Sequence, residues 1–408
     1  MAELKIEGLG REGDGFAKFK GQPVHIPFSL PGETVSAVQT GKSWRLDKIH
    51  NSSPDRVDAP CPHFGSCGGC QMQHMAEEPY KAWKLDLVTR ALSQQGIDVD
   101  VEGPVTFPVD TRRKVTFQVS SIDKKVALGF SEQGSHQIVP ITTCSILHPV
   151  ILEKLDDLKK LAEPVVTKNS NLRMAVLMTE EGLDVELSGL KAVSEEQRSQ
   201  LARRVVELGI LRLSLEDEVL LEPIKAIVYL GDTAVVPPPG AFVQAVKQAE
   251  DAMVSLVCEH LKSCKSVADL FCGIGTFALN LAKNSTVLAV EENNAALESL
   301  DRGWRETGGK LKQIKTEARN LDRRPVTFAE LKKIAGVVFD PPRAGAELQA
   351  RQIAKSKAVK VAAVSCNPIT LARDLRILLD GGYKLKRVIA IDQFRYTPHV
   401  EVVALLER

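Results

Sequence analysis

One cysteine stands where an apolar strand is expected to end, in a position suited to chemistry. The segment VKVAAV (359–364) is short and apolar, and Ser365, Cys366, Asn367 and Pro368 follow it. Most single cysteines only fill space in a core, but this thiol lies outside the apolar run, at a strand-to-loop corner. A thiolate exposed at such a corner can attack a substrate and form a covalent intermediate. We therefore interpret Cys366 as a nucleophile.

A covalent route also needs a separate group that accepts a proton. Glu401 is the best candidate, because it closes the motif PHVE just before the apolar run VVALL. His399 in the same motif is the alternative base. The neighbouring Phe394, Tyr396 and Pro398 offer a second explanation for His399, which is packing.

A glycine-containing turn, DLFCGIGT (269–276), predicts a cofactor site between a strand and a helix. Glycines let the backbone approach a ligand closely. Glu291 ends the next apolar strand, where a carboxylate can bind both hydroxyls of a ribose, and Glu292 is the alternative. Asp340 follows a later strand in the motif DPPR. The third glycine of a dinucleotide site is missing, which argues against a dehydrogenase, and the order of these motifs is typical of Rossmann-like methyltransferases.

Three clustered cysteines, Cys61, Cys67 and Cys70, predict a metal site. Cys144, in a distant turn, is the expected fourth ligand. Four thiolates suit either zinc or an iron–sulfur cluster, and His63 and His74 are less favoured substitutes. The spacing differs from the triad of radical S-adenosylmethionine enzymes.

The elements that must position these residues fall into three parts. Residues 1–50 show short alternating runs broken by Gly and Pro, which predicts a five-stranded OB-type barrel. The middle part predicts an α+β unit with helices over 77–95, 149–162 and 194–208, strands over 115–122, 125–132 and 136–141, and a hairpin over 172–190. From about residue 240, a helix over 241–262 leads into alternating strands and helices, which predict a mostly parallel, doubly wound sheet.

Composition excludes some functions and leaves others open. The chain has 408 residues, a hydrophobic fraction of 44% and a net charge of +1. No apolar run is long enough to span a membrane, and we expect no signal peptide and a cytoplasmic protein. The near-neutral charge neither supports nor excludes a nucleic-acid partner, because phosphates are bound by local patches.

The motifs together resemble the RNA uridine-5 methyltransferase family. DLFCGIGTFAL, the strand-end Glu291, DPPRAG, SCNP and PHVE occur in the expected order. Residues 1–50 resemble the RNA-binding TRAM barrel, and the cysteine cluster matches the family too. The resemblance implies that S-adenosylmethionine methylates C5 of a uridine in rRNA or tRNA. Thiolate addition to C6 would make C5 nucleophilic, and a base would then remove the C5 proton.

The resemblance also implies roles for particular residues. Cys366 is then the nucleophile and Glu401 the base, and a four-iron cluster binds the four cysteines with a structural role. It implies cofactor contacts by Gln244, Phe271, Thr276, Glu291, Asn320 and Asp340. Phe271 and Thr276 replace the family's common Tyr and Asn, which removes a side-chain hydrogen bond.

Two other enzyme classes and one non-enzyme are alternatives to this interpretation. Cytosine-5 RNA methylation usually shows a second functional cysteine near DPP, and adenine N6 methylation favours an aromatic residue there, whereas Arg343 occupies this place. An RNA-binding iron–sulfur protein with a decayed active site conflicts with the intact Cys366 and Glu401. The sequence thus predicts a multidomain α/β protein. Residues 1–55 form the TRAM-like barrel, 56–235 the cluster loop with a central α+β domain, and 236–408 the Rossmann-like methyltransferase domain. We expect an RNA partner and a monomer.

Overall fold

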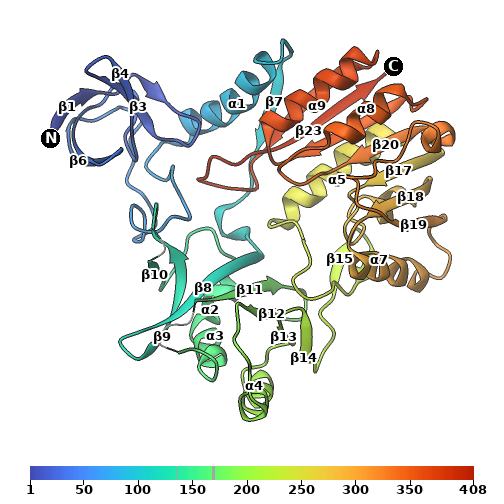
Figure 1. Ribbon diagram of the computed structural model, residues 1–408, viewed down its shortest axis with the longest axis horizontal. Coiled ribbons are helices and arrows are strands. Elements are labelled where there is room, and N and C mark those ends of the chain that lie inside the picture. Colours follow the sequence, from blue (N-terminus) through green and yellow to red (C-terminus); the bar gives the residue numbers. More distant parts are fainter. Residues whose placement is uncertain (136, 168–170) are drawn as a thin grey trace.

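The computed structural model describes residues 1–135, 137–167 and 171–408. Its N-terminal part is a small β unit at the left of Figure 1, built from two three-stranded antiparallel sheets. Leu4, Ile6, Ala17 and Ile26 are buried between the sheets. Residues 2–51 thus form six short strands, where the sequence predicted five. The strands are β1 (Ala2–Lys5), β2 (Gly8–Leu9), β3 (Gly15–Phe19), β4 (Gln22–Ile26), β5 (Thr34–Thr40) and β6 (Ser43–Asn51).

The central part is a seven-stranded sheet of order β10-β9-β8-β11-β12-β13-β14. Helices α2, α3 and α4 lie below it in Figure 1 and bury apolar side chains against it. The expected hairpin is confirmed, because β11 and β12 pair antiparallel. The helices are α2 (Pro149–Glu153), α3 (Leu155–Ala162) and α4 (Glu195–Glu207), and the strands are β8 (Lys114–Ile122), β9 (Lys125–Ser131), β10 (Ile138–Pro140), β11 (Leu172–Met178), β12 (Leu183–Ser188), β13 (Arg212–Leu215) and β14 (Glu218–Leu221).

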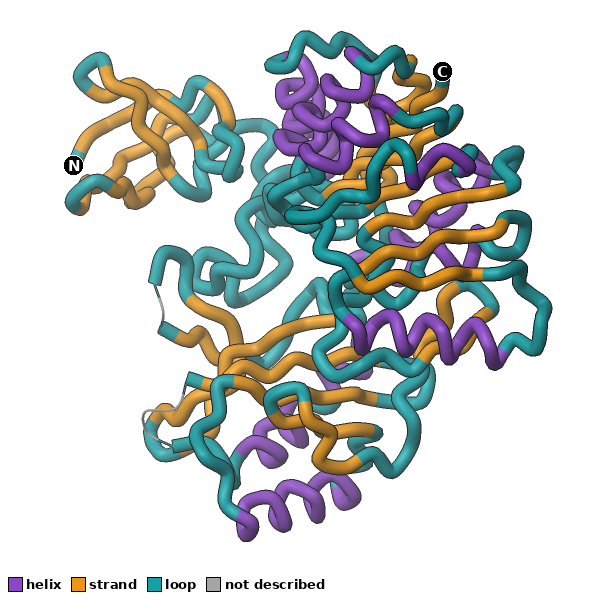
Figure 2. The backbone as a smooth tube through the Cα atoms, turned by 45° about the vertical axis from the view of Figure 1, so that its right-hand side comes forward, coloured by secondary structure: helices purple, strands orange, loops and turns teal. Residues whose placement is uncertain are grey.

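The C-terminal part is an eight-stranded sheet of order β19-β18-β17-β20-β21-β23-β22-β7. Its first five strands are parallel, as predicted, and β23 runs antiparallel to both neighbours. Helices cover both faces of the sheet (Figure 2). The strands are β17 (Ser266–Leu270), β18 (Thr286–Glu291), β19 (Ile314–Ala318), β20 (Gly336–Phe339), β21 (Lys360–Ser365), β22 (Lys384–Ile391) and β23 (Glu401–Glu407).

Two apolar layers hold the helices on this sheet. One layer buries α5 (Lys247–Leu261), α6 (Ala278–Leu281) and α7 (Asn294–Glu306). The opposite layer buries α8 (Glu347–Lys355) and α9 (Pro368–Asp380). A two-stranded hairpin, β15 (Val228–Leu230) and β16 (Thr233–Val235), packs against α7.

Two elements from the middle of the chain join the C-terminal sheet. Strand β7 (Val101–Val105) pairs parallel with β22, and α1 (Glu77–Ser93) packs against α9 and β7. Val88, Ala91 and Leu92 of α1 are buried in the same apolar layer as α8 and α9. The chain therefore places α1 between the barrel and the catalytic sheet.

The helices differ from the prediction at two points. The segment expected as a helix from 241 becomes helical only at Lys247, because Pro237, Pro238, Pro239 and Gly240 favour an extended lead-in. The segment 149–162 forms two helices, with a break at Lys154. Of the strand expected over 136–141, His136 lies outside the described residues. Within the described part of the chain, every helix is too short or too polar to cross a membrane.

Candidate active site and cysteine cavity

Three strand ends bring the proposed catalytic residues to one edge of the C-terminal sheet. Asp340 follows β20, Cys366 follows β21, and Glu401 begins β23. Strands β20, β21 and β23 are consecutive neighbours, and Ser365 pairs with Val402. The antiparallel register therefore sets Cys366 beside Glu401, with Asp340 on the adjacent strand.

Burial dominates the electrostatics of this group. Glu401 is 3% exposed, and burial together with the negative charge of Asp340 raises its pKa to about 8. Burial raises the pKa of the Cys366 thiol to about 11, and the carboxylates of Glu401 and Asp340 raise it in the same direction. Arg343 opposes this shift with its positive charge. A carboxylate with a raised pKa is a stronger proton acceptor than an exposed one.

An amide bridge connects the two carboxylates. Gln393 Nε2 donates to Glu401 Oε1 and to Gln244 Oε1, both at 2.8 Å. Gln244 Nε2 in turn lies 3.4 Å from Asp340 Oδ2. Glu401 Oε2 is buried and has no hydrogen-bond partner among the described residues. The bond from Gln393 therefore holds one carboxylate oxygen in place and leaves the other without a partner among the described residues.

Sequence reasoning missed Gln393. It is buried in the segment between β22 and β23, and no motif or apolar periodicity marks it in the sequence. Its role follows only from the contacts with Glu401 and Gln244.

His399, the alternative base, is engaged elsewhere. Its Nε2 lies 3.1 Å from Arg343 Nη2. Burial lowers the pKa of His399 to about 4, and the positive charges of Arg343, Lys84, Arg11 and Arg112 act in the same direction. A histidine with so low a pKa is a weak base at neutral pH, which favours Glu401.

A buried ion pair fixes the loop that carries these residues. Lys84 of α1 and Asp392 have fully buried side chains and lie 2.7 Å apart. Lys84 Nζ also donates to the carbonyls of Phe394 and His399. Tyr80 Oη donates to Asp392 at 2.6 Å. Helix α1 therefore anchors the loop between β22 and β23.

The glycine turn has the geometry of a ligand cradle. Phe271, Gly273 and Gly275 have φ values of 63°, 53° and 100°. A Cβ atom on Gly273 would meet only open space, which leaves room for a ligand, whereas one on Gly275 would lie 2.4 Å from Leu300. The turn is therefore open on one side and packed on the other.

Glu291 closes this cradle, as its strand-end position predicted. Its carboxylate accepts hydrogen bonds from the backbone N–H groups of Gly273 at 3.1 Å, Glu292 at 2.8 Å and Asn293 at 3.0 Å. Glu292 instead accepts a hydrogen bond from Asn320 Nδ2 at 2.7 Å. The geometry thus favours Glu291 over Glu292 as the acid at the turn.

The remaining predicted cofactor residues are spread along the same edge. Thr276 follows the turn before α6, and its carbonyl accepts a hydrogen bond from Asn280. Asn320 lies in a separate open depression with Glu292 and Arg319. Gln244 and Asp340 belong to the catalytic group described above.

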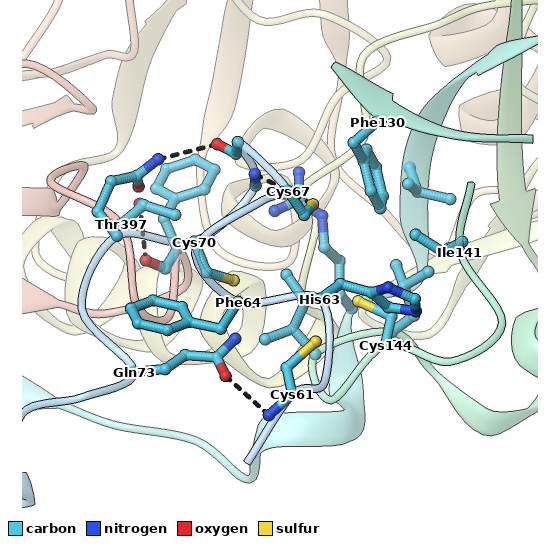
Figure 3. Close-up of a pocket in the computed structure, with 18 of the residues that line it drawn as sticks. Cys61, His63, Phe64, Cys67, Cys70, Gln73, Phe130, Ile141, Cys144 and Thr397 are labelled. Atoms are coloured by element: carbon cyan, nitrogen blue, oxygen red, sulfur yellow. Dashed lines mark hydrogen bonds between the residues drawn. The ribbon is translucent and has the colours of Figure 1, made fainter. Parts of the chain in front are cut away.

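The four cysteines line one cavity of about 400 Å³. Figure 3 shows Cys61, Cys67 and Cys70 on one loop and Cys144 on the facing segment, with their sulfur atoms turned toward the same space. The backbone N–H of Gly68 donates to the carbonyl of Ser131, which ties this loop to β9. Within the described residues, no three His, Cys, Asp or Glu side chains are grouped closely enough to share one metal ion.

Of the two histidines near the cysteines, His63 lines the same cavity and His74 does not. His63 Nε2 accepts a hydrogen bond from the backbone N–H of Thr142 at 3.3 Å. His74 is buried between the rings of Phe28 and Phe64. The four cysteines are therefore better candidates for metal ligands than either histidine.

The fold and the site define a Rossmann-like methyltransferase with an N-terminal nucleic-acid-binding type of barrel. Residues 233–408 match the family model described as tRNA (Uracil-5-)-methyltransferase, and residues 2–37 match the TRAM domain. A Brucella suis protein described as an uncharacterized RNA methyltransferase is 45% identical over 406 residues, covering 100% of this chain and 98% of the relative. The 23S rRNA (uracil(1939)-C(5))-methyltransferase RlmD of Shewanella halifaxensis is 32% identical, covering 99% of this chain and 95% of the relative. The chain belongs to the RNA uracil-5-methyltransferase family and is an RNA (uracil-5-)-methyltransferase.

A solved structure agrees in fold over the whole chain. The Pyrococcus abyssi tRNA (uracil-54, C5)-methyltransferase, solved with S-adenosyl-L-homocysteine, has a TM-score of 0.75 and 24% sequence identity. The alignment covers 99% of both chains. Family and fold together support S-adenosylmethionine as the methyl donor.

Proposed function

We propose that this enzyme methylates C5 of one uridine in 23S rRNA through a covalent bond between Cys366 and C6 of the base. The observation that carries the mechanism is the grouping of Cys366, Asp340 and Glu401 at three adjacent strand ends. The free Oε2 of the buried Glu401 supports its role as the base, because no other described group competes for it.

The residues of the chain divide the reaction into four steps. The Cys366 thiol loses its proton to solvent as its sulfur adds to C6, and the electrons of the C5–C6 double bond move toward C5. S-adenosylmethionine, when bound, supplies the methyl group to C5. Glu401 then removes the C5 proton, and those electrons restore the double bond as the C6–sulfur bond breaks. The proton passes from Glu401 to solvent, and the Cys366 thiolate is regenerated.

The cofactor residues are also part of this proposal. Glu291 is the ribose-binding acid, because it closes the glycine turn. Phe271 and Thr276 flank the same turn, and Asn320 extends the edge toward the adenine end. Gln244 and Asp340 lie where the cofactor and the target base meet, since they connect to Glu401 through Gln393.

The choice of rRNA depends on the relative with a named substrate. The Shewanella enzyme acts on uracil 1939 of 23S rRNA and aligns with nearly the whole chain at 32% identity. A tRNA uridine is the second candidate, favoured by the description of the matching family model. The P. abyssi tRNA enzyme is less similar in sequence and supports only the fold.

Deletion of the gene should remove 5-methyluridine from one position of 23S rRNA and leave tRNA unchanged. Mass spectrometry of nuclease fragments from both RNA classes measures this, and re-expression of the wild-type chain should restore the modification. Loss of 5-methyluridine from tRNA alone would contradict the rRNA assignment and establish the second candidate. Because bacteria can contain related enzymes, purified protein should also methylate 23S rRNA isolated from the deletion strain.

We also propose that Cys61, Cys67, Cys70 and Cys144 hold a four-iron cluster with a structural role. The fit of the residues to such a group rests on four thiols that face one cavity. A four-iron cluster is wider than a zinc ion and takes four thiolate ligands. The cluster would cross-link the loop 61–70 to the central sheet.

Replacing Cys144 with serine should remove the bound iron and sulfide and destabilise the central part of the chain, because one of four ligands is lost. Iron and sulfide analysis of protein purified without oxygen, with thermal unfolding, measures both effects. Cys258→Ser is the matched control, since Cys258 lies on α5 and packs outside the cavity. Stoichiometric zinc without iron in the wild-type protein would rule out the cluster.

We further propose that the enzyme acts as a monomer in the cytoplasm. The catalytic group and the glycine turn are both built from a single chain.

A further inference from the structure

A second pocket of about 240 Å³ opens beside the nucleophile. Cys366 and Asn367 form one side of it, and α1 forms the other. Arg11 from the barrel, Arg90 from α1 and Arg343 from the DPPR motif bring three guanidinium groups to its wall. The lining contains no carboxylate, so the pocket is suited to an anion.

The position of Arg11 is set by contacts between the barrel and α1. Trp83 Nε1 donates to the carbonyl of Gly10 at 3.4 Å, and Gly13 lies against Met72. These contacts hold the short loop on which Arg11 stands.

The lining residues of α1 share one helix face. Leu87, Arg90, Ala91 and Gln94 lie at helical spacings of three, four and seven residues, and Trp83 lies one turn earlier on the same side of the helix. Trp83 packs this face of α1 against the barrel, and Arg90 extends from the same face. The barrel loop and α1 thus present their arginines to the same space.

The acids near these arginines do not close the pocket. Arg90 Nε donates to Asp86 Oδ1 at 2.8 Å, and Arg11 lies 3.9 Å from Glu12. Both pairs are exposed, and exposed ion pairs contribute little free energy. A phosphate can therefore compete for both guanidinium groups.

Apolar side chains form the rest of the pocket wall, on α1 as well as on the facing loops. Leu87, Pro368, Ile369 and Pro398 contribute to it, and Ile369 is 40% exposed. A wall that combines arginines with apolar side chains matches the two halves of a nucleotide, its phosphate and its base. An inorganic anion would contact only the arginines and would leave the apolar side chains unused.

We propose that this second pocket binds a nucleotide adjacent to the target uridine. Arg11, Arg90 and Arg343 hold its phosphate, and its base lies against the apolar wall. The proposal depends on the proposed function, because Cys366 at the pocket's edge identifies the neighbouring base as the target. The barrel then contributes directly to the active site, through Arg11.

Binding of fluorescein-labelled pentauridylate, measured by anisotropy without methyl donor at several salt concentrations, tests the proposal. Arg11→Gln and Arg90→Gln should each weaken binding about tenfold, because each removes a charged contact to phosphate. In the double variant, the slope of log affinity against log salt should fall by about 0.7, as expected for one lost phosphate contact on a single strand. Arg45→Gln is the matched control, since Arg45 is an exposed barrel residue outside the pocket.

Three results would overturn the subsite. The first is that the wild type does not bind pentauridylate. The second is that Arg11→Gln, Arg90→Gln and Arg45→Gln bind it equally well. The third is that hexaglutamate competes as strongly as unlabelled pentauridylate, which would indicate an acidic protein partner. Thermal unfolding verifies that each variant is folded. Because the assay involves no methyl transfer, its failure is distinct from failure of the covalent mechanism, which adduct formation tests separately.

Discussion

Cys366→Ala should yield no methylated RNA and no covalent adduct. Removal of the nucleophile eliminates the addition to C6, and C5 of the intact uracil ring reacts poorly with a methyl donor. By comparison with other covalent enzymes, we expect turnover to fall by at least about 10⁴-fold. Transfer of radiolabelled methyl groups to RNA, together with denaturing gels of the enzyme–RNA mixture, measures both outcomes.

RNA that contains 5-fluorouridine provides the complementary experiment. Wild-type enzyme should become trapped on this RNA, because fluorine at C5 cannot leave as a proton. Cys366→Ala should form no such species. Cys272→Ala is the matched control for a cysteine near the cofactor turn, since this thiol is buried and outside the catalytic group. Absence of an adduct with the wild-type enzyme would refute the covalent mechanism.

Glu401→Gln should separate methyl transfer from product release. The glutamine keeps the shape of the side chain and a contact to Gln393, but it cannot accept the C5 proton. Attack and methyl transfer should still occur, while overall turnover falls by about 10²–10⁴-fold, the usual contribution of a positioned base. The expected product is enzyme bound covalently to methylated RNA, visible as a slow-migrating band that survives denaturant.

The pH dependence distinguishes Glu401 from His399. Glu401 acts only when deprotonated, and its pKa is raised to about 8 by burial and by Asp340. The rate at which the methylated covalent adduct releases its RNA is independent of the Cys366 thiol titration, and in the wild type it should rise with pH and level off above about 8. A base role for His399, whose pKa is lowered to about 4, would instead give a rate that is flat across this range. If His399→Gln releases methylated RNA from the covalent adduct and Glu401→Gln does not, the base is assigned to Glu401.

The sequence was sufficient to predict the strand-end residues. Apolar runs that stop at Glu291, Asp340 and Cys366 mark the carboxyl ends of parallel strands, which meet at one edge of such a sheet. The structure confirms these positions. Cys61, Cys67 and Cys70 could likewise be grouped in advance because they lie close together in the sequence, and Cys144 was the fourth ligand expected from a distant turn.

Other features depend on contacts between distant segments, which local patterns do not encode. Nothing in the segment VEGPV indicates that β7 joins the catalytic sheet, and nothing in α1 indicates that Lys84 pairs with Asp392. Gln393 is similarly an ordinary amide until the fold places it between Glu401 and Gln244. The sixth strand of the barrel was missed because β2 has only two residues.

The insertion of β23 between β21 and β22 has a consequence for the order in which the chain can fold. Most of the chain separates β7 from β22, and such distant pairings close slowly because of the entropy lost on loop closure. A nascent chain that has formed β17–β21 already displays Cys366, yet the edge of β21 is still open and no carboxylate lies opposite the thiol. Catalytic competence therefore arrives in a late step, when β22 and β23 dock.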